Sequence, residues 1–401
     1  MLLDAVLVAL AVPALAGAAY LAFLTASSLR RRKAVPSVSA RRLRFDVIVP
    51  AHDEESGIAA TVASLRALDW PRHRFRVFVV ADNCADRTRA RAAEAGARVL
   101  ERNDPLRRGK GFALEFAFGR LLEEGSADAF VVVDADSVAS PGLLEAFACQ
   151  LEAGAEAAQA RNGVLNPDAH WRTQLMTLAF ALFNDVRSLG RDRAGLSCGL
   201  RGNGMCLTRG ALLRVPHRAT SIVEDLEYGL RLGEQGIRVA YAPEGQVLSA
   251  MATAESASRS QRRRWEGGRL SLARRRAPGL LAAALRRRSA LLFDLAADLL
   301  LPPLSWLGAW SLAGAVASAA VGARAPLACF VATLGLLGFH VARGWGLSGL
   351  GLRGAAALLH LPRYVAWKVA VLVTRPERER SEFVRTPRER PDALEARRSG
   401  S

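Results

Sequence analysis

Apolar residues follow different spacings in different parts of the chain, and each spacing predicts a different kind of element. Residues 1–29 are a nearly continuous apolar run of about 20 residues with Asp4 as its single acid. The basic residues 30–33 follow at once. This pattern predicts a transmembrane helix. A cleaved signal peptide is the alternative, but its positive charge would precede the apolar stretch.

Short β-rich runs alternate with helical segments between Phe45 and Val247. The runs are FDVIVPAH, RVFVVADN, ARVLER and AFVVVDADS. Strands that alternate with helices predict a mostly parallel sheet with helices on both faces, because each helix carries the chain back to start the next parallel strand. The soluble part is therefore expected to be an α/β domain.

The chain becomes apolar again after Arg288. Residues 291–322 and 326–347 are each expected to span the membrane, and residues 358–373, which mix charge with apolar residues, are expected to lie at its surface. The predicted organisation is a membrane helix and basic linker over 1–40, an α/β domain over 41–285, membrane and interfacial helices over 286–375 and a charged tail over 376–401.

Charge along the chain predicts its orientation. The net charge is +17, and eleven arginines with Glu266 as the one acid lie between Arg259 and Arg288. Basic residues that border membrane spans favour the cytoplasmic side, so we expect a multi-pass protein of the inner (plasma) membrane with a cytoplasmic α/β domain. Few aromatic residues interleave with these arginines, which argues against a nucleic-acid partner. The five cysteines have no CxxC spacing and are expected to be reduced thiols.

Asp134 and Asp136 follow the apolar run 130–133 directly. If the strand continues through them, the two carboxylates share one face of the sheet, and the small Ala135 leaves room for a ligand. Ligands of open α/β sheets bind at the carboxyl ends of strands, and hard carboxylate oxygens suit Mg²⁺ or Mn²⁺. A helix N-cap followed by a solvent-facing aspartate is the alternative for this pair.

Further polar stretches occur at the expected ends of strands and starts of helices. They are VIVPAHDEES (47–56), VVADNCADRT (79–88), RRGKGFAL (107–114), SIVEDLEYGLRL (221–232) and QRRRW (261–265). Together with DAD and in this order, they resemble membrane-bound family 2 glycosyltransferases of the GT-A fold, the branch with cellulose, hyaluronan and poly-N-acetylglucosamine synthases and ceramide glucosyltransferases. The resemblance covers residues 44–275 and implies a Rossmann-like, mostly parallel GT-A domain.

The resemblance implies roles for the donor side of the site. The expected donor-binding residues are Pro50, Ala51, His52, Glu54, Asp82, Lys110 and Asp134, with Asp134 and Asp136 as metal ligands. Asp82 would accept the N3 proton of the base, which favours uracil, although a strand-end aspartate also forms turns. Lys110 at a helix start would face the diphosphate, and a solvated loop lysine is its alternative.

The resemblance also implies the catalytic and acceptor residues. Asp225 matches the carboxylate that takes the proton of the attacking hydroxyl, while an acid that complements a helix dipole is the alternative. The acceptor and diphosphate side would contain Gly202, Gly204, Glu224, Gln261, Arg264 and Trp265. The neighbouring Arg262 and Arg263 leave open which arginine of QRRRW faces the diphosphate.

The implied function is that of an inverting, metal-dependent glycosyltransferase. It would move a sugar from a UDP-sugar to a lipid or growing polysaccharide at the cytoplasmic face and form a β-linkage. Three spans are few for a polysaccharide channel, so a lipid acceptor or an export partner is expected. A membrane-anchored GT-A-like scaffold, or a non-catalytic subunit of a polysaccharide synthesis or export complex, is the alternative. A nucleotidyltransferase would need a glycine-rich entry loop in place of VPAHDEE.

Overall fold

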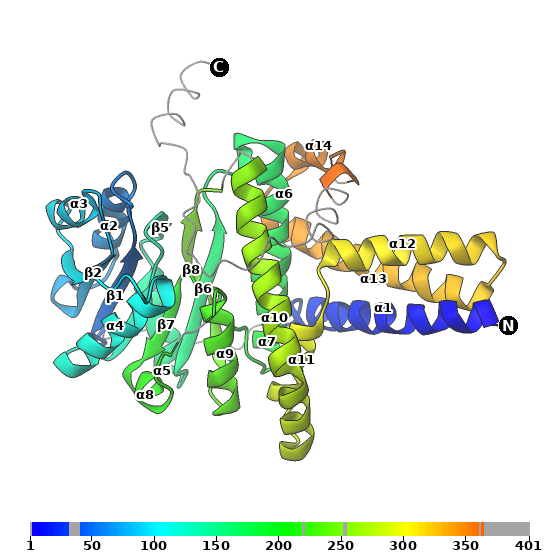
Figure 1. The fold of residues 1–401 in the computed structure, drawn as a ribbon, viewed down its shortest axis with the longest axis horizontal. Coiled ribbons are helices and arrows are strands. Elements are labelled where there is room, and N and C mark those ends of the chain that lie inside the picture. Colours follow the sequence, from blue (N-terminus) through cyan, green and yellow to red (C-terminus); the bar gives the residue numbers. More distant parts are fainter. Residues whose placement is uncertain (1, 32–40, 219–220, 252–254, 361, 365–401) are drawn as a thin grey trace.

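The computed structural model describes residues 2–31, 41–218, 221–251, 255–360 and 362–364. The side chains of residues 2, 255–264 and 353 are outside this description, as are the charged tail 376–401 and residues 365–373 of the expected interfacial helix. Figure 1 shows a sheet domain at one end and a bundle of long helices at the other.

Eight strands form one sheet in the order β3-β2-β1-β4-β7-β6-β8-β5. They are β1 (Phe45–Ala51), β2 (Phe75–Asp82), β3 (Arg98–Arg102), β4 (Ala129–Val132), β5 (Ser137–Ala139), β6 (Ala157–Val164), β7 (Met205–Thr208) and β8 (Val239–Ser249). The first four pair in parallel, as do β6 and β8, while β7 is antiparallel to both of its neighbours and β5 is antiparallel to β8. The predicted mostly parallel α/β sheet is confirmed.

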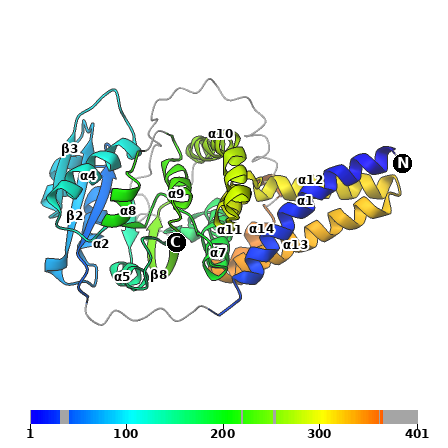
Figure 2. The ribbon, with the colours of Figure 1, turned by 90° about the horizontal axis from the view of Figure 1, so that it is seen from below.

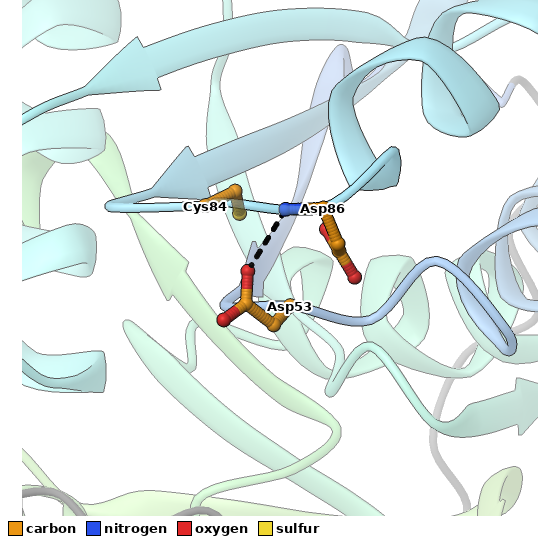
Figure 3. A group of neighbouring side chains, drawn as sticks. All are labelled: Asp53, Cys84 and Asp86. Atoms are coloured by element: carbon orange, nitrogen blue, oxygen red, sulfur yellow. Dashed lines mark hydrogen bonds between the residues drawn. The ribbon is translucent and has the colours of Figure 1, made fainter.

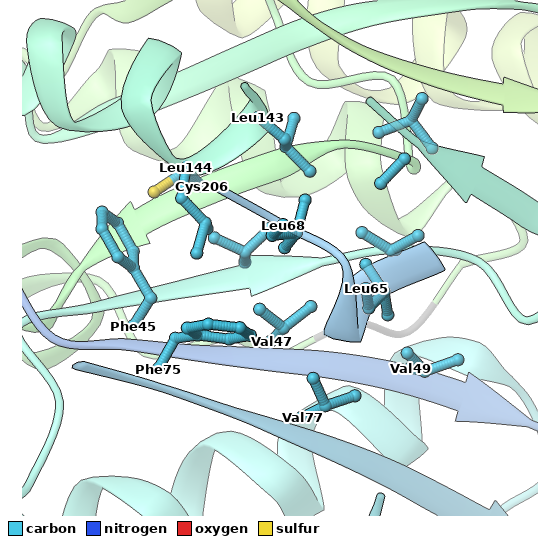
Figure 4. Close-up of a cluster of buried hydrophobic side chains, with 14 of the residues drawn as sticks. Phe45, Val47, Val49, Leu65, Leu68, Phe75, Val77, Leu143, Leu144 and Cys206 are labelled. Atoms are coloured by element: carbon cyan, nitrogen blue, oxygen red, sulfur yellow. The ribbon is translucent and has the colours of Figure 1, made fainter. Parts of the chain in front are cut away.

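Helices cover both faces of this sheet because the central strands β1, β2 and β4 carry buried apolar residues on both faces. The helices are α2 (Ile58–Arg66), α3 (Thr88–Glu94), α4 (Lys110–Glu124), α5 (Leu143–Glu152), α8 (Arg209–Arg214) and α9 (Glu224–Glu234). On one face Val47 and Val49 pack with Leu65 and Leu143 (Figure 4). On the other face, Ile48 belongs to a separate buried cluster that contains residues of α4.

The bundle contains α1 (Leu2–Ser27), α12 (Leu304–Ala320) and α13 (Arg324–Ser348), which pack through a shared apolar cluster (Figures 1 and 2). The segments 3–27 and 324–348 are each long and apolar enough to cross a membrane. The region expected to span over 291–322 forms a bent pair, α11 (Ala290–Leu300) and α12, at 69° to each other, which together are long and apolar enough to cross a membrane, so the third span stays a prediction. Pro302 and Pro303 cause this break, because a proline cannot donate a helical hydrogen bond.

A further layer of helices lies between the sheet and the bundle. A nearly continuous helical segment consists of α6 (Trp171–Phe180), the π-helical turn η3 (Ala181–Val186) and α7 (Arg187–Arg193). The long helix α10 (Glu255–Arg287) packs with α9 and α11. The remaining short elements are η1 (Arg72–Arg74), η2 (Pro167–Ala169), η4 (Leu352–Gly354) and α14 (Ala355–Leu358).

A buried ion network joins this layer to the first helix. Arg191 lies 3.0 Å from Asp294 and 2.6 Å from Asp298, and it also donates to the hydroxyl of Tyr20 at 2.6 Å. The Tyr20 hydroxyl in turn donates to Asp294 at 2.7 Å. Arg187 pairs with Asp298. Breaking one partner of a buried ion pair leaves an uncompensated charge, so α1, α7 and α11 are held in one arrangement.

His217 gives the fold a pH-sensitive element. Its ring lies 5.3 Å from that of Phe118 and 4.7 Å from that of Tyr228, and neither nitrogen has a hydrogen-bond partner among the described residues. Burial, with the charges of Arg231 and Lys110, lowers the pKa of His217 to about 4. Below about pH 6.5 the histidine of the unfolded chain takes up a proton, while His217 of the folded protein stays neutral down to about pH 4. The free energy of unfolding therefore falls as the pH is lowered from about 6.5 to about 4.

We predict that His217→Phe removes this acid sensitivity. The parent should lose about 2 kcal/mol more than the variant between about pH 7.5 and about pH 5, because only the parent carries the histidine. Denaturant unfolding in detergent at both pH values measures the difference, and comparing each protein with itself cancels the packing effect of the new ring. Equal losses in the two proteins would contradict the assignment.

Candidate functional site

The candidate site lies where the carboxyl ends of β1, β2 and β4 meet. The loops that follow these strands lie there, together with the 199–204 loop and the first residues of α4 and α9. This edge is where parallel sheets bind ligands, because loops from neighbouring strands converge on it. The structure therefore gathers segments that are far apart in sequence.

Lys110 is the central cation of the site. It is the first residue of α4, and its Nζ donates to Asp134 Oδ1 and to the carbonyl of Gly202, both at 2.5 Å. Glu224 Oε1 lies 3.9 Å from the same nitrogen. Burial opposes the charge of Lys110, but the carboxylates of Asp134 and Glu224 outweigh it and raise the pKa of the ammonium. The lysine thus links the loop after β4, the 199–204 loop and α9.

Asp134 and Asp136 lie in a turn instead of on a strand. The strand ends at Val132, and the turn is closed by a hydrogen bond from Ser137 N to Asp134 O at 3.1 Å. The expected alternation of faces therefore does not apply to the pair. Both carboxylates are half-buried at the carboxyl end of β4. Two solvent-accessible hard oxygen donors of this kind fit a divalent cation such as Mg²⁺ or Mn²⁺.

Asp225 faces the loop that contains Gly202. A Cβ atom at Gly202 would lie 3.1 Å from Asp225 Oδ2 and 3.5 Å from Lys110 Nζ, so the glycine allows the close approach of backbone and carboxylate. Gly202 also has a φ of +77°, which favours glycine. Burial raises the pKa of Asp225 although Lys110 opposes it, and burial with the charge of Asp225 raises the pKa of Glu224.

The residues after β1 and β2 that were expected on the donor side lie next to each other. His52 Nδ1 is 2.7 Å from the carbonyl of Asp82, and the backbone N–H of Glu54 donates to Thr88 Oγ1 at 2.6 Å. The buried Asp82 accepts hydrogen bonds on Oδ1 from Arg102 Nη1 at 2.6 Å and from Asn83 Nδ2 at 2.9 Å. One oxygen of the expected base-reading carboxylate is therefore engaged within the protein.

A small cluster of potential metal ligands fastens these two loops (Figure 3). The ligand atoms of Asp53, Cys84 and Asp86 lie within 4.8 Å of one another. Asp53 Oδ1 accepts hydrogen bonds from the backbone of Ala85 at 2.7 Å and of Asp86 at 3.3 Å, while Asp86 Oδ2 accepts one from Glu55 N at 3.1 Å. These bonds cross between the loops, so the carboxylates hold the loops after β1 and β2 together.

The two amides of Gln159 and Asn203 support the site and were not expected from sequence. Asn203 Oδ1 accepts from Asp134 N at 3.0 Å, and its Nδ2 donates to Ser137 Oγ at 2.9 Å. Gln159 Nε2 donates to the carbonyl of Asn203 at 2.7 Å, and its Oε1 accepts from Arg201 N at 2.8 Å. Both amides are buried. A polar glutamine in the apolar run AAQA of β6 was the available signal.

The QRRRW segment lies on α10. Gln261 and Arg264 have side chains outside the described residues, while Trp265 is 42% exposed. The same helix passes close to the start of α9, because a Cβ at Gly268 would lie 2.8 Å from Val223 Cγ1. The expected contribution of the segment to the acceptor side stays a prediction, as do Pro50 and Ala51 at the end of β1 and Gly204 before β7.

Comparison with known proteins places this geometry in a family. A model of the family described as glycosyltransferase like family 2 matches residues 42–268. The chain is 29% identical over 263 residues to a beta-monoglucosyldiacylglycerol synthase of Synechocystis sp., covering 61% of this chain and 54% of that protein. It is 26% identical over 255 residues to the UDP-forming cellulose synthase catalytic subunit of Xanthomonas axonopodis pv. citri, covering 61% and 34%. The chain thus spans about half or less of these relatives.

The fold agrees with a solved structure. A mannosyltransferase of Pyrobaculum calidifontis, in complex with GDP-Man and Mn²⁺, superposes with a TM-score of 0.57 at 18% identity and covers 85% of this chain and 97% of its own. This likeness shows the GT-A fold alone. Since the family match covers more than half of the 401 residues, the protein belongs to glycosyltransferase family 2, as its motifs predict.

Proposed function

We propose that the protein is an inverting, metal-dependent glycosyltransferase that transfers a sugar from a UDP-sugar to a lipid or polysaccharide acceptor at the cytoplasmic membrane face. The observation that carries the proposal is the approach of Asp225 to Gly202, with Lys110 joining Gly202 to Asp134. A proton acceptor and a cation that can face a diphosphate thus both lie next to the same point, the position that a Cβ of Gly202 would occupy. The relatives support a nucleotide-sugar donor and acceptors of the lipid or polysaccharide class.

On the donor side, the positive charge of Lys110 would stabilise the negative charge of a bound diphosphate. Its ammonium lies at the start of α4, where backbone N–H groups and the helix dipole also favour an anion. A Mg²⁺ or Mn²⁺ ion held by Asp134 and Asp136 would supply further positive charge for the departing diphosphate. His52 and Asp82 at the two fastened loops would hold and select the base.

On the acceptor side, Asp225 is suited to remove the proton of an acceptor hydroxyl. Burial raises its pKa, and a general base works best when its pKa lies closer to the working pH. The hydroxyl oxygen attacks the anomeric carbon, the bond to the diphosphate breaks, and the proton goes to Asp225. Attack opposite the leaving group on an α-linked donor gives a β-linked product.

We predict that Asp225→Asn separates binding from chemistry. The amide keeps the size of the side chain but cannot accept the proton, so transfer should slow by at least ~100-fold while UDP binding with metal is retained. Calorimetric UDP titration and single-turnover transfer on one preparation measure both. Normal turnover would exclude the base, and lost UDP binding would move Asp225 to the donor site. Glu123→Gln, an exposed change on α4, is the control.

We predict that transfer requires a divalent cation bound through Asp136. EDTA should abolish transfer and excess Mg²⁺ or Mn²⁺ should restore it, while Asp136→Ala should stay inactive at the cation concentration that restores the parent. The variant is expected to fold, because Asp136 is half-buried and its loss leaves no large cavity. Thermal unfolding of the variant checks this. Undiminished transfer in EDTA or in the folded variant would overturn the metal assignment.

We predict that the α/β domain faces the cytoplasm, because basic residues border the membrane segments. The test uses Arg120→Cys, an exposed position on α4, in a background without Cys84, Cys149 and Cys329. A membrane-impermeant thiol reagent should label it only after the cells are permeabilised. Labelling in intact cells would show the opposite orientation.

A further inference from the structure

The last residues of two neighbouring strands form a buried ion pair next to the loops expected on the donor side. Strands β2 and β3 run in parallel at the edge of the sheet, and their register places Asp82 opposite Arg102. Figure 2 shows both strands next to α4. Arg102 Nη1 lies 2.6 Å from Asp82 Oδ1, and the two side chains are 7% and 6% exposed. The pairing of the strands therefore holds this arginine against the carboxylate.

The protein uses only one of the two oxygens of Asp82. Oδ1 accepts hydrogen bonds from Arg102 Nη1 at 2.6 Å and from Asn83 Nδ2 at 2.9 Å. A carboxylate oxygen has about two acceptor positions, so both positions of Oδ1 are filled. Oδ2 accepts no hydrogen bond from the described residues, and it is not among their buried atoms that lack a partner, so solvent reaches it. Asp82 thus offers one open acceptor atom.

Both donors on Asp82 Oδ1 are fixed by further contacts. Arg102 Nη2 donates to Asp104 Oδ2 at 3.2 Å, and the guanidinium lies 5.9 Å from the centre of the Phe112 ring. Asn83 Oδ1 accepts from Asp104 N at 2.8 Å, and Asn83 N donates to the carbonyl of Arg102 at 2.8 Å. A ligand would have to break this set of bonds to reach Oδ1, so Oδ2 is the oxygen available to it.

The ion pair is joined to the rest of the candidate site. His52 Nδ1 lies 2.7 Å from the backbone carbonyl of Asp82. Asp104 Oδ2 also accepts from Arg107 Nε at 2.8 Å, and Lys110 follows three residues later. The segment 102–110 therefore links the carboxylate expected to bind the base with the lysine expected to face the diphosphate.

Nucleotide bases differ in the number of N–H groups that they present to a carboxylate. Uracil presents the single N3–H, while guanine presents N1–H and an N2–H side by side. Two adjacent donors need both oxygens of a carboxylate, and a single donor needs one. At Asp82 guanine would leave one donor without a partner, which costs free energy in a buried site. The N3 atom of cytosine and the N1 atom of adenine carry no proton and would face the carboxylate with a lone pair.

We propose that Arg102 is a positioning residue that selects the base. It fills Oδ1 of Asp82, so the open Oδ2 accepts a single N–H and the site takes uracil and excludes guanine. This inference rests on the proposed function, in which Asp82 binds the base of the donor. Arg102 acts through Asp82 and does not itself contact the nucleotide.

A panel of four nucleotides tests the proposal by binding, without any need for turnover. UDP, CDP, GDP and ADP are titrated calorimetrically, with Mg²⁺, into the purified full chain in detergent. The parent should bind UDP at least ~10-fold more tightly than CDP and GDP, because each of these leaves a polar group unpaired. CDP tests whether Asp82 recognises the base at all. ADP has the size of GDP but lacks its N1–H, so it reports the effect of purine size.

Substitution of Arg102 tests the role of the filled oxygen. Arg102→Met keeps a long side chain but removes the donors, so the affinity for GDP should rise by about 10-fold relative to both UDP and ADP. The ratio of UDP to CDP affinity should stay, because Oδ2 is unchanged. Arg102→Lys keeps a cationic donor and should keep guanine excluded. Arg98→Met removes an exposed arginine of the same strand and should leave every ratio unchanged.

A second variant guards against a folding defect, because loss of Arg102 breaks a buried ion pair. Asn83 has a φ of +51°, which glycine adopts readily, so Asn83→Gly removes the other donor on Oδ1 with little strain. It should also raise the affinity for GDP relative to UDP and ADP. Thermal unfolding checks that both variants fold.

Other outcomes would overturn the proposal. Unchanged GDP-to-UDP ratios in the folded variants would mean that the shape of the pocket excludes guanine. An equal rise for GDP and ADP would mean that the substitution only made room for a purine. Equal binding of UDP and CDP by the parent would show that Asp82 does not recognise the base. That last result contradicts the base assignment of the proposed function, and the inference with it, whereas the GDP results contradict the inference alone.

Discussion

One ammonium group holds the candidate active site together. Lys110 lies at the meeting point of Asp134, Glu224 and the carbonyl of Gly202. A Cβ atom at Gly202 would lie 3.5 Å from Lys110 Nζ and 3.1 Å from Asp225 Oδ2, so the second acid of α9 approaches the same glycine. Without that cation, Glu224 and Asp225 would repel each other in a buried site that already raises the pKa of both carboxyl groups. The positions of α4, α9 and the loop after β4 therefore depend on this contact. One ammonium faces three acids there, so a divalent cation would add positive charge that the site lacks for a diphosphate.

The sheet could be predicted from the sequence because each strand is marked by its own local pattern of apolar residues. Runs such as FDVIVPA show apolar residues on both faces of a strand, and that pattern needs no knowledge of distant partners. The turn at Asp134 did not follow, since an amide from Asn203, 69 residues away, binds its backbone N–H. Gln159 was missed for the same reason: a single polar residue in a strand gives no sign of which distant loop it binds.

Hydropathy predicted part of the helix bundle. It predicted the two long helices 3–27 and 324–348, but it could not predict the 69° bend that two prolines introduce within 291–322. The two acids of α11 explain why this helix packs against α7. Asp294 and Asp298 are four residues apart, so they lie on one helix face, and both meet Arg191 of α7. A mean hydropathy over a window of residues cannot reveal that these aspartates pair with a distant arginine.

The 199–204 loop connects the two charge systems of the molecule. Arg201 lies with Arg187 and Arg269 around the ring of Phe183, while Gly202 belongs to the site around Lys110. Gln159 and Asn203 fix the backbone of this loop, and Asn203 also binds the backbone N–H of Asp134. The same buried amide contacts therefore position the residue next to Arg201 and the turn that contains Asp134, so the two charge systems meet in one short segment of backbone.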